Sequence, residues 1–176
     1  MRKLLLLRHA KAEIGSLAIP DIDRQLMPRG RKAASRMARY IADECLTPDY
    51  VICSSAARTR ETLSLIKPVL WPQGIPDTAL AFEPLIYEAP YERILHVIHR
   101  APNNAKTLMV VGHNPGLEDL VDALMMTADK DAEQKLRAKY PTCALAVLTF
   151  PVSLWEDVIE QGGHLERFVT PRALAD

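Results

Sequence analysis

Two short apolar runs that each end in a histidine are the feature that most restricts how this chain can fold. The first is Lys3–Leu7, which continues into Arg8 and His9, and the second is Thr107–Val111, which is followed closely by His113. Short runs that are apolar throughout are typical of strands buried on both faces, as in a parallel sheet covered by helices. Open sheets of this kind place their ligands at the carboxyl ends of the strands. The two histidines are therefore predicted to lie at the same edge of a central sheet.

The rest of the chain alternates between helical and strand-like patterns. Apolar residues spaced by threes and fours predict a helix over Arg29–Glu44, and the β-branched run Tyr50–Cys53 predicts another buried strand. This alternation predicts an α/β fold, a three-layer α/β/α sandwich with a mostly parallel central sheet and an antiparallel strand among the late ones. The other expected segments are a helix over 56–70 ended by Pro68 and Pro72, a helix over 91–100, a helix opened by Asn114 and Pro115, a solvated helix or loop over 128–139, and strands over 79–82, 144–150 and 165–170.

Length and charge limit the classes of function. A chain of 176 residues predicts a single domain over 1–176. Lys plus Arg and Asp plus Glu number 22 each, so no general field attracts nucleic acid or anionic lipid, and an anion has to be bound by a local cluster of arginines. The leucines after Met1 are too few for an export signal and no apolar run reaches membrane-spanning length. We therefore expect a cytoplasmic protein with no nucleic-acid partner and no membrane partner.

The residues at the predicted strand ends suit phosphoryl transfer. A neutral imidazole can attack phosphorus in line and form a phosphohistidine that water then hydrolyses, so His9 is the candidate nucleophile. Planar guanidinium groups match phosphoryl oxygens; Arg8 lies beside His9, and Arg58 falls in the first turn of the helix that follows Ser54. His113, just ahead of a helix start, is a candidate phosphate ligand. The predicted phosphate-binding residues are thus Arg8, Arg58 and His113.

An acid that protonates the leaving oxygen of an ester is less clearly marked. Glu88 is the carboxylate best placed in a predicted sheet-edge loop, and Asp23, in the loop after the first strand, is its rival. A third alternative is that the reaction uses no dedicated acid. Asp23 has a purely structural alternative role as well, either capping a helix or pairing with Arg24.

Four segments, in this order, resemble the motifs of the histidine phosphatase superfamily. They are Leu7–Lys11, Asp23–Gly30, Ser54–Thr62 and Val111–Gly116. The short chain and the runs Leu-Arg-His-Ala-Lys and Gly-His-Asn-Pro-Gly are similar, within that superfamily, to the SixA-like phosphohistidine phosphatases. This resemblance implies a phosphoglycerate-mutase-like fold without a large cap, and an enzyme that needs no metal and no cofactor.

The resemblance also implies a role for individual residues. Arg8 and His9 match the family's arginine and phosphorylated histidine, Arg58 its second arginine and His113 its second histidine, whereas Glu88 matches the acid only loosely. The chain departs from the usual motifs at three uncharged positions, Ala10, Met27 and Ala56. None of these departures removes a charged catalytic group.

Together, the residues and the resemblance predict a metal-independent phosphatase that works through a phosphohistidine on His9. An open site admits a protein side chain, and the nitrogen leaving group of a phosphoramidate is readily protonated, which fits the loose match at Glu88. The partner is thus a phosphorylated protein or a small phosphorylated substrate: phosphohistidine in a protein is the first substrate hypothesis, a small phosphate ester the second and mutase activity the third. The non-enzymatic alternative is a module that binds phosphorylated proteins without turnover. The oligomeric state is left open.

Overall fold

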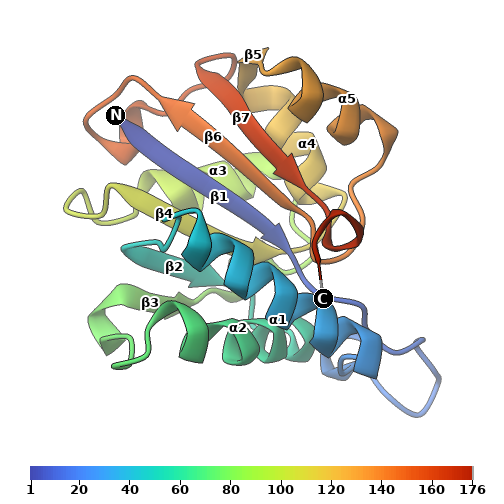
Figure 1. Cartoon of the computed structure of the whole chain (residues 1–176). Helices are drawn as coiled ribbons and strands as arrows, with labels where there is room; N and C mark the ends of the chain where they lie inside the picture. The colour runs from blue at the N-terminus through green and yellow to red at the C-terminus, as the bar shows by residue number, and fades with distance from the viewer. Residues whose placement is uncertain (176) are drawn as a thin grey trace.

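The computed structural model describes residues 1–175 and contains one mixed sheet between two layers of helices (Figure 1). The strands lie in the order β3-β2-β4-β1-β6-β7-β5. β6 runs antiparallel to both of its neighbours, β1 and β7, whereas the other paired strands are parallel. The strands are β1 (Arg2–Arg8), β2 (Tyr50–Cys53), β3 (Leu80–Phe82), β4 (Thr107–Gly112), β5 (Met125–Ala128), β6 (Leu145–Phe150) and β7 (Gly163–Val169).

Helices cover both faces of this sheet because its central strands are apolar on both sides. Leu5 and Leu7 of β1 pack beneath α1 and α2, while Leu4 and Leu6 pack on the opposite face against α3, α4 and α5. The predicted α/β/α sandwich and its late antiparallel strand are both present. The α-helices are α1 (Pro28–Asp43), α2 (Ala57–Leu70), α3 (Tyr91–His99), α4 (Gly116–Leu124) and α5 (Lys130–Ala138), and the short 3-10 helices are η1 (Asp21–Asp23), η2 (Asp77–Ala79), η3 (Pro84–Ile86), η4 (Trp155–Asp157) and η5 (Pro171–Ala173).

Two features differ from the sequence-based predictions, the role of Pro68 and the strand β5, and one open alternative is decided. Pro68 lies inside α2 and does not end it; the helix continues to Leu70, and Trp71 N still donates to the Lys67 carbonyl at 2.8 Å. Of the two alternatives for 128–139, the structure has the helix, α5, which is mostly exposed and buries only Ala132 and Leu136. β5 was not predicted at all.

Among residues 1–175, no helix has the length and apolar character needed to cross a membrane.

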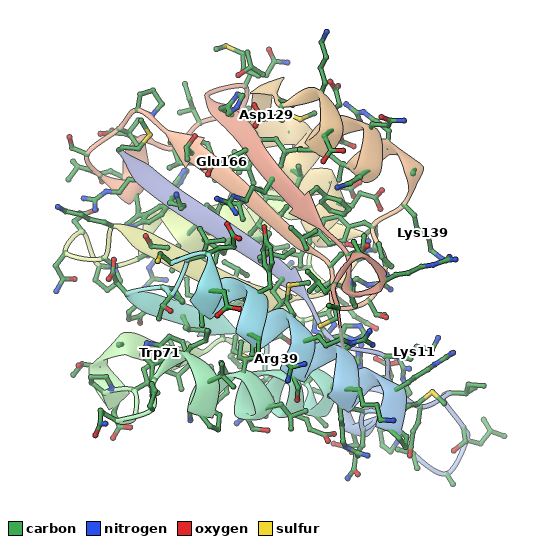
Figure 2. The ribbon with its side chains drawn as sticks, viewed as in Figure 1. Lys11, Arg39, Trp71, Asp129, Lys139 and Glu166 are labelled. Atoms are coloured by element: carbon green, nitrogen blue, oxygen red, sulfur yellow. The ribbon has the colours of Figure 1, made fainter. Side chains whose placement is uncertain are left out.

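A long loop leaves the carboxyl end of β1 and returns to start α1. Its ends are held together by a β-bridge between Ala12 and Leu26 and by Met27 N, which donates to the Lys11 carbonyl at 2.8 Å. Gly30 in the first turn of α1 permits this approach, because a Cβ atom there would lie 2.2 Å from the Lys11 oxygen. The Lys11 side chain extends outward from this junction (Figure 2). The loop between the two joined ends therefore projects beyond the sheet edge.

Candidate active site

The carboxyl ends of β1, β2 and β4 bring the predicted site residues together. β4 pairs with both other strands, and the register places Arg8 opposite Gly112 and Cys53 opposite Val111. His9, the residue after β1, and His113, the residue after β4, therefore lie side by side, with ring centroids 5.4 Å apart. Both rings are buried, at 7% and 5% exposed. The carboxyl ends of the two neighbouring strands thus place His9 against His113.

The His9 ring is held in one neutral tautomer by the backbone of the next residue. Its Nδ1 lies 2.7 Å from the Ala10 carbonyl oxygen, which can only accept, so the neutral ring carries its proton on Nδ1 and leaves the Nε2 lone pair available. Ala10 N is itself fixed by the Thr62 hydroxyl at 3.0 Å. Burial, with a smaller contribution from the charges of Arg58 and Arg8, lowers the pKa of His9 to about 4. His9 is thus neutral, with a free Nε2, at neutral pH.

His113 is oriented by Ser54, the residue that follows β2. Ser54 Oγ lies 2.7 Å from His113 Nε2 and also accepts from Ala56 N at 3.4 Å; we assign the hydroxyl proton to the bond with Nε2. Nδ1 of His113 is then the protonated nitrogen, and it is buried without a hydrogen-bond partner within residues 1–175. Burial, followed by His9 and Arg58, lowers the pKa of His113 to about 3. A neutral imidazole thus presents one unused donor.

Two arginines complete a cationic site around the histidines. Arg58, in the first turn of α2, is 4% exposed and donates through Nη1 to the Asp21 backbone carbonyl at 2.8 Å. Arg8 donates through Nη1 to the Tyr140 carbonyl at 2.8 Å, and burial lowers its pKa. The Nε atoms of both guanidinium groups are buried and have no partner in the described part of the chain. Because buried donors are normally satisfied, these groups are arranged to receive an acceptor such as an oxyanion.

Asp21 and Tyr87 also lie in the site, although sequence reasoning did not select them. The Asp21 carboxylate contacts Arg58 Nη2 at 3.2 Å and accepts a short hydrogen bond from the Tyr87 hydroxyl. This hydrogen bond, together with the charges of Arg58 and Arg24, lowers the pKa of Asp21 to about 2. The Tyr87 ring packs edge-on against His113, with centroids 5.4 Å apart. Neither residue lies in a periodic element or a recognisable motif; the only signal is that Asp21 lies two positions before Asp23 and Tyr87 lies directly before Glu88.

The two candidate acids occupy different positions. Glu88 is exposed, adopts a left-handed backbone with φ 50°, and lines a cavity of about 480 Å³ together with His113 and Asn114. Asp23 is exposed in η1 and does not make the predicted pair with Arg24, whose Nε instead contacts Asp21 at 2.9 Å. In a 3-10 helix of three residues per turn, positions two apart point in different directions, so Asp21 faces the cluster and Asp23 does not. The Asp23–Arg24 pairing was therefore wrong.

Donor chemistry at this site favours an anion. The groups gathered there are guanidinium ions and neutral imidazoles, and within residues 1–175 no three side chains of His, Cys, Asp or Glu cluster as a bound metal ion would require.

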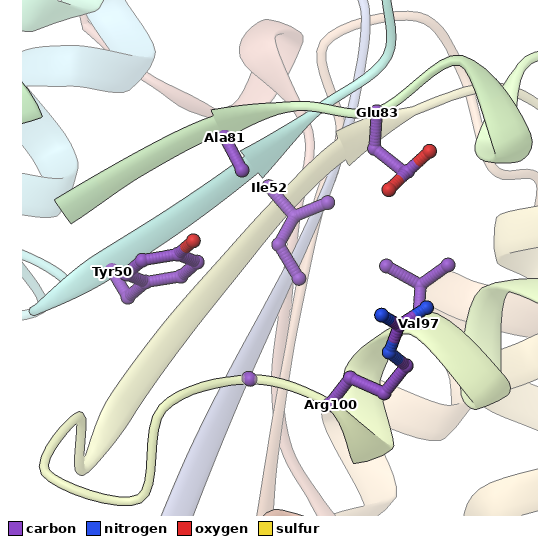
Figure 3. A pocket seen from close by; sticks show the side chains of 7 residues that line it. Tyr50, Ile52, Ala81, Glu83, Val97 and Arg100 are labelled. Atoms are coloured by element: carbon purple, nitrogen blue, oxygen red, sulfur yellow. The ribbon is translucent and has the colours of Figure 1, made fainter. Parts of the chain in front are cut away.

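A second hollow, separate from the candidate active site, lies between β2, β3 and α3, where Glu83 and Arg100 face each other across the opening (Figure 3). That hollow measures about 170 Å³, less than the ~300 Å³ of an ordinary ligand pocket.

Comparison with known proteins places the whole chain among phosphatases. The sequence profile of the histidine phosphatase superfamily (branch 1) matches residues 4–81. An uncharacterized protein of Mycobacterium tuberculosis is 32% identical over 168 residues, which cover 94% of this chain and 100% of that protein. Two solved structures, both assigned as phosphohistidine phosphatase SixA, have the same fold. The one from Agrobacterium tumefaciens is 30% identical with a TM-score of 0.77 over 97% of this chain and 98% of that one. The one from Nakamurella multipartitia is 29% identical with a TM-score of 0.82 over 98% and 97%.

Proposed function

The chain belongs to the histidine phosphatase superfamily and is a phosphatase of the SixA-like type; from this premise we propose that it works without a metal, through a phosphohistidine on His9. We propose further that its substrate is phosphohistidine in a protein. The observation that carries the proposal is the set of unpaired nitrogens around His9. The free Nε2 of His9 is accompanied by three buried nitrogens without partners, Arg8 Nε, Arg58 Nε and His113 Nδ1.

These groups divide the work of an in-line displacement. His9 Nε2 forms a bond to phosphorus while the bond from phosphorus to the leaving nitrogen or oxygen breaks, and the leaving group takes a proton. Water then attacks the phosphohistidine, which releases inorganic phosphate and regenerates the imidazole. Arg8, Arg58 and the Nδ1 proton of His113 supply donors for the three non-bridging oxygens, over which the charge of the transferring phosphoryl group is spread in the transition state. The low pKa of His9 keeps the attacking nitrogen unprotonated.

The position of Glu88 bears on the choice of substrate. Its exposed carboxylate lines the cavity beside His113 and contacts neither His9 nor either guanidinium group within residues 1–175. A phosphoramidate nitrogen is readily protonated by solvent, whereas an alkoxide leaving group needs a placed acid. Hydrolysis of phosphohistidine therefore depends less on proton donation by Glu88 than hydrolysis of an ester does. A small phosphate ester is the second candidate, favoured by the fact that Glu88 does reach the cavity shared with His113.

The first experiment measures phosphate release from a histidine-phosphorylated protein and from an aryl phosphate, with a metal chelator present. The proposal expects release by the wild type, none by His9→Ala, and unchanged release by His96→Ala, which alters an exposed histidine on α3. Loss of activity in the chelator would contradict the metal-independent mechanism. Tight vanadate binding without phosphate release from either substrate would support the non-catalytic binding module instead.

A variant of the acid separates the two substrate classes. Because only the ester requires a donated proton, Glu88→Gln should lower kcat for an alkyl phosphate by about tenfold or more and change kcat for phosphohistidine by about twofold at most. Equal losses on both substrates would contradict this assignment of Glu88. The cytoplasmic location and the lack of nucleic-acid and membrane partners stay predictions from the sequence.

A further inference from the structure

A broad basic groove lies beside the active site. It is bounded by the first turns of α1, the carboxyl end of α5 and η5, and has a volume of about 690 Å³. No acidic residue is among the described residues that line it. Its basic residues are Lys11, Arg29, Arg36, Lys135, Lys139 and Arg172.

Four of these cations have no compensating charge among residues 1–175. Lys135 is paired with Asp131 at 2.8 Å, and Arg36 has an interaction of its own. The remaining four are exposed and make no ion pair or side-chain hydrogen bond with any residue in 1–175; they are Lys11, Arg29, Lys139 and Arg172. Side chains of Lys11 and Lys139 extend from the same side of the molecule (Figure 2). Like charges held together without partners create a local positive potential that attracts an anionic ligand.

The basic groove shares a wall with the active site. Pro141 and Thr142 line the groove, and the next residue, Cys143, donates its N–H to the His9 carbonyl at 2.9 Å. The residue before them, Tyr140, accepts the hydrogen bond from the Arg8 guanidinium group. Lys11 is only two residues beyond His9. The groove is therefore joined through hydrogen bonds to the segment that carries Arg8 and His9.

An apolar loop tip on the same side indicates what kind of anion this is. Ile14 is 90% exposed and Leu17 is fully exposed, in the loop that follows Lys11. The loop is a defined structure, because Ser16 and Ile19 form a β-bridge and Arg24 donates to the Glu13 carbonyl at 2.8 Å. Exposed apolar side chains next to a functional site are typical of protein contacts. A small polyanion or a nucleic-acid backbone has no apolar surface that could cover these two side chains, whereas a protein does.

We propose that the basic groove docks an acidic segment of the protein substrate while Ile14 and Leu17 contact an apolar part of the same protein. This inference rests on the proposed function, since it assumes that the phosphoryl group arrives on a protein. Docking of this kind raises the rate of encounter and fixes orientation without changing the chemical step. It therefore predicts a specificity for the sequence around the phosphohistidine that free phosphohistidine cannot show.

The test compares two histidine-phosphorylated peptides, one with a run of glutamates beside the phosphohistidine and one with glutamines in their place. The wild type should have a lower KM for the acidic peptide, and Lys139→Glu/Arg172→Glu should raise that KM about tenfold. In this variant kcat, the KM of the glutamine peptide and turnover of free phosphohistidine should be unchanged. The matched control is Lys106→Glu/Lys130→Glu, which reverses two exposed charges outside the groove.

A second pair of measurements tests the apolar contact and the class of ligand. Ile14→Ser/Leu17→Ser should raise the KM of a histidine-phosphorylated protein but leave free phosphohistidine unaffected. Binding of a labelled, unphosphorylated Glu-rich peptide should weaken as salt increases and should weaken further in the groove variant. Equal KM values for the two peptides, or equal losses on all substrates, would overturn the proposal. Groove-dependent binding of an oligonucleotide as tight as that of the peptide would overturn it too.

These measurements distinguish a failure of the groove from a failure of the proposed function. If the wild type hydrolyses neither phosphorylated peptide but binds the Glu-rich peptide through Lys139 and Arg172, the proposed function is wrong and the docking surface stands. If it hydrolyses both peptides equally well and the groove variant binds the Glu-rich peptide normally, the docking surface is wrong and the proposed function stands.

Discussion

At the scale of single residues, hydrogen bonds decide which nitrogen of each histidine does the chemistry. The Ala10 carbonyl leaves Nε2 of His9 free, and the Ser54 hydroxyl leaves Nδ1 of His113 as an unused donor. The ring centroids are only 5.4 Å apart, so a phosphoryl group that meets the lone pair of His9 also lies close to the N–H of His113. A change of tautomer in either ring would reverse one of these roles.

Ser54→Ala tests this arrangement. Without the hydroxyl, His113 loses the hydrogen bond that favours protonation on Nδ1, so we expect kcat to fall about fivefold, the equivalent of one ordinary hydrogen bond of about 1 kcal/mol. ¹⁵N NMR of His113 should show a mixture of tautomers where the wild type shows one. Ser55→Ala, at the neighbouring position, should keep both the rate and the spectrum. A wild-type tautomer in Ser54→Ala would contradict the proposed role of the hydroxyl.

The sequence contained enough information to predict four of these residues but not the groups that orient them. Arg8, His9 and His113 follow apolar runs whose strand character is plain, and Arg58 opens a helix at a third strand end. Asp21 reaches Arg58 only because a long loop folds back over α2. That return depends on tertiary contacts between residues 37 positions apart, for which local periodicity gives no signal.

At the scale of elements, the active site depends on how closely α1 approaches the loop after β1. The first turn of α1 passes so near the Lys11 backbone that only glycine fits at position 30, where a Cβ would lie 2.2 Å from the Lys11 oxygen and 2.9 Å from its nitrogen. Both neighbours are backbone atoms, so neither can move without shifting the strand end or the helix. The strand end in question is the one that carries His9.

Gly30→Ala should therefore destabilise the protein and disturb the site together. We expect the free energy of unfolding to fall by about 2 kcal/mol or more, as for other overpacked positions, and KM to rise because the β1 end is displaced. Urea unfolding and steady-state kinetics measure the two effects. Gly15→Ala is the matched control, since a Cβ at that exposed position meets the Arg24 side chain at an ordinary 3.4 Å. Wild-type stability in Gly30→Ala would show that the contact can relax freely.

Elements with a strong pattern were predicted well, and those that depend on the rest of the sheet were not. β2 matches its predicted bounds, and β1 and β4 differ by one residue at the ends. β5 was missed because its burial does not alternate and it forms only by pairing with β7 at the sheet edge. The end of α2 at Leu70 was predicted, but Pro68 does not cause it, since the helix continues past the proline.

At the scale of the whole molecule, a net charge of zero conceals a strong separation of charge. The 22 basic and 22 acidic residues cancel in the sum, yet the groove beside His9 contains six cations and no acidic side chain among its described residues. Composition alone argued against an anionic partner attracted by the charge of the whole protein. It gave no information about a local site for an anionic partner. Because α1, α5 and η5 surround one hollow, lysines and arginines that are far apart in the sequence line a single basic groove.

Burial of two neutral histidines beside two arginines should make the whole molecule sensitive to acid. The pKa of His9 is lowered to about 4 and that of His113 to about 3, whereas an unfolded histidine has a pKa of about 6.5. Above about pH 6.5 both states are neutral and the two groups add no pH dependence. As the pH falls below that value, the unfolded chain binds protons that the folded protein does not, so the free energy of unfolding decreases.

Urea unfolding at about pH 7.5 and about pH 5 measures this loss, which should be about 2 kcal/mol for each of the two histidines. His9→Asn removes one titrating group and should lose about half as much stability over the same interval. His96→Asn replaces an exposed imidazole and should keep the wild-type dependence. Vanadate, which places negative charge against Arg8 and Arg58, should stabilise the wild type at both pH values, because a ligand that binds only the folded state opposes unfolding. Identical pH dependence in His9→Asn and the wild type would mean that His9 has the same pKa in the folded and the unfolded protein, which would contradict the lowered pKa of the buried imidazole.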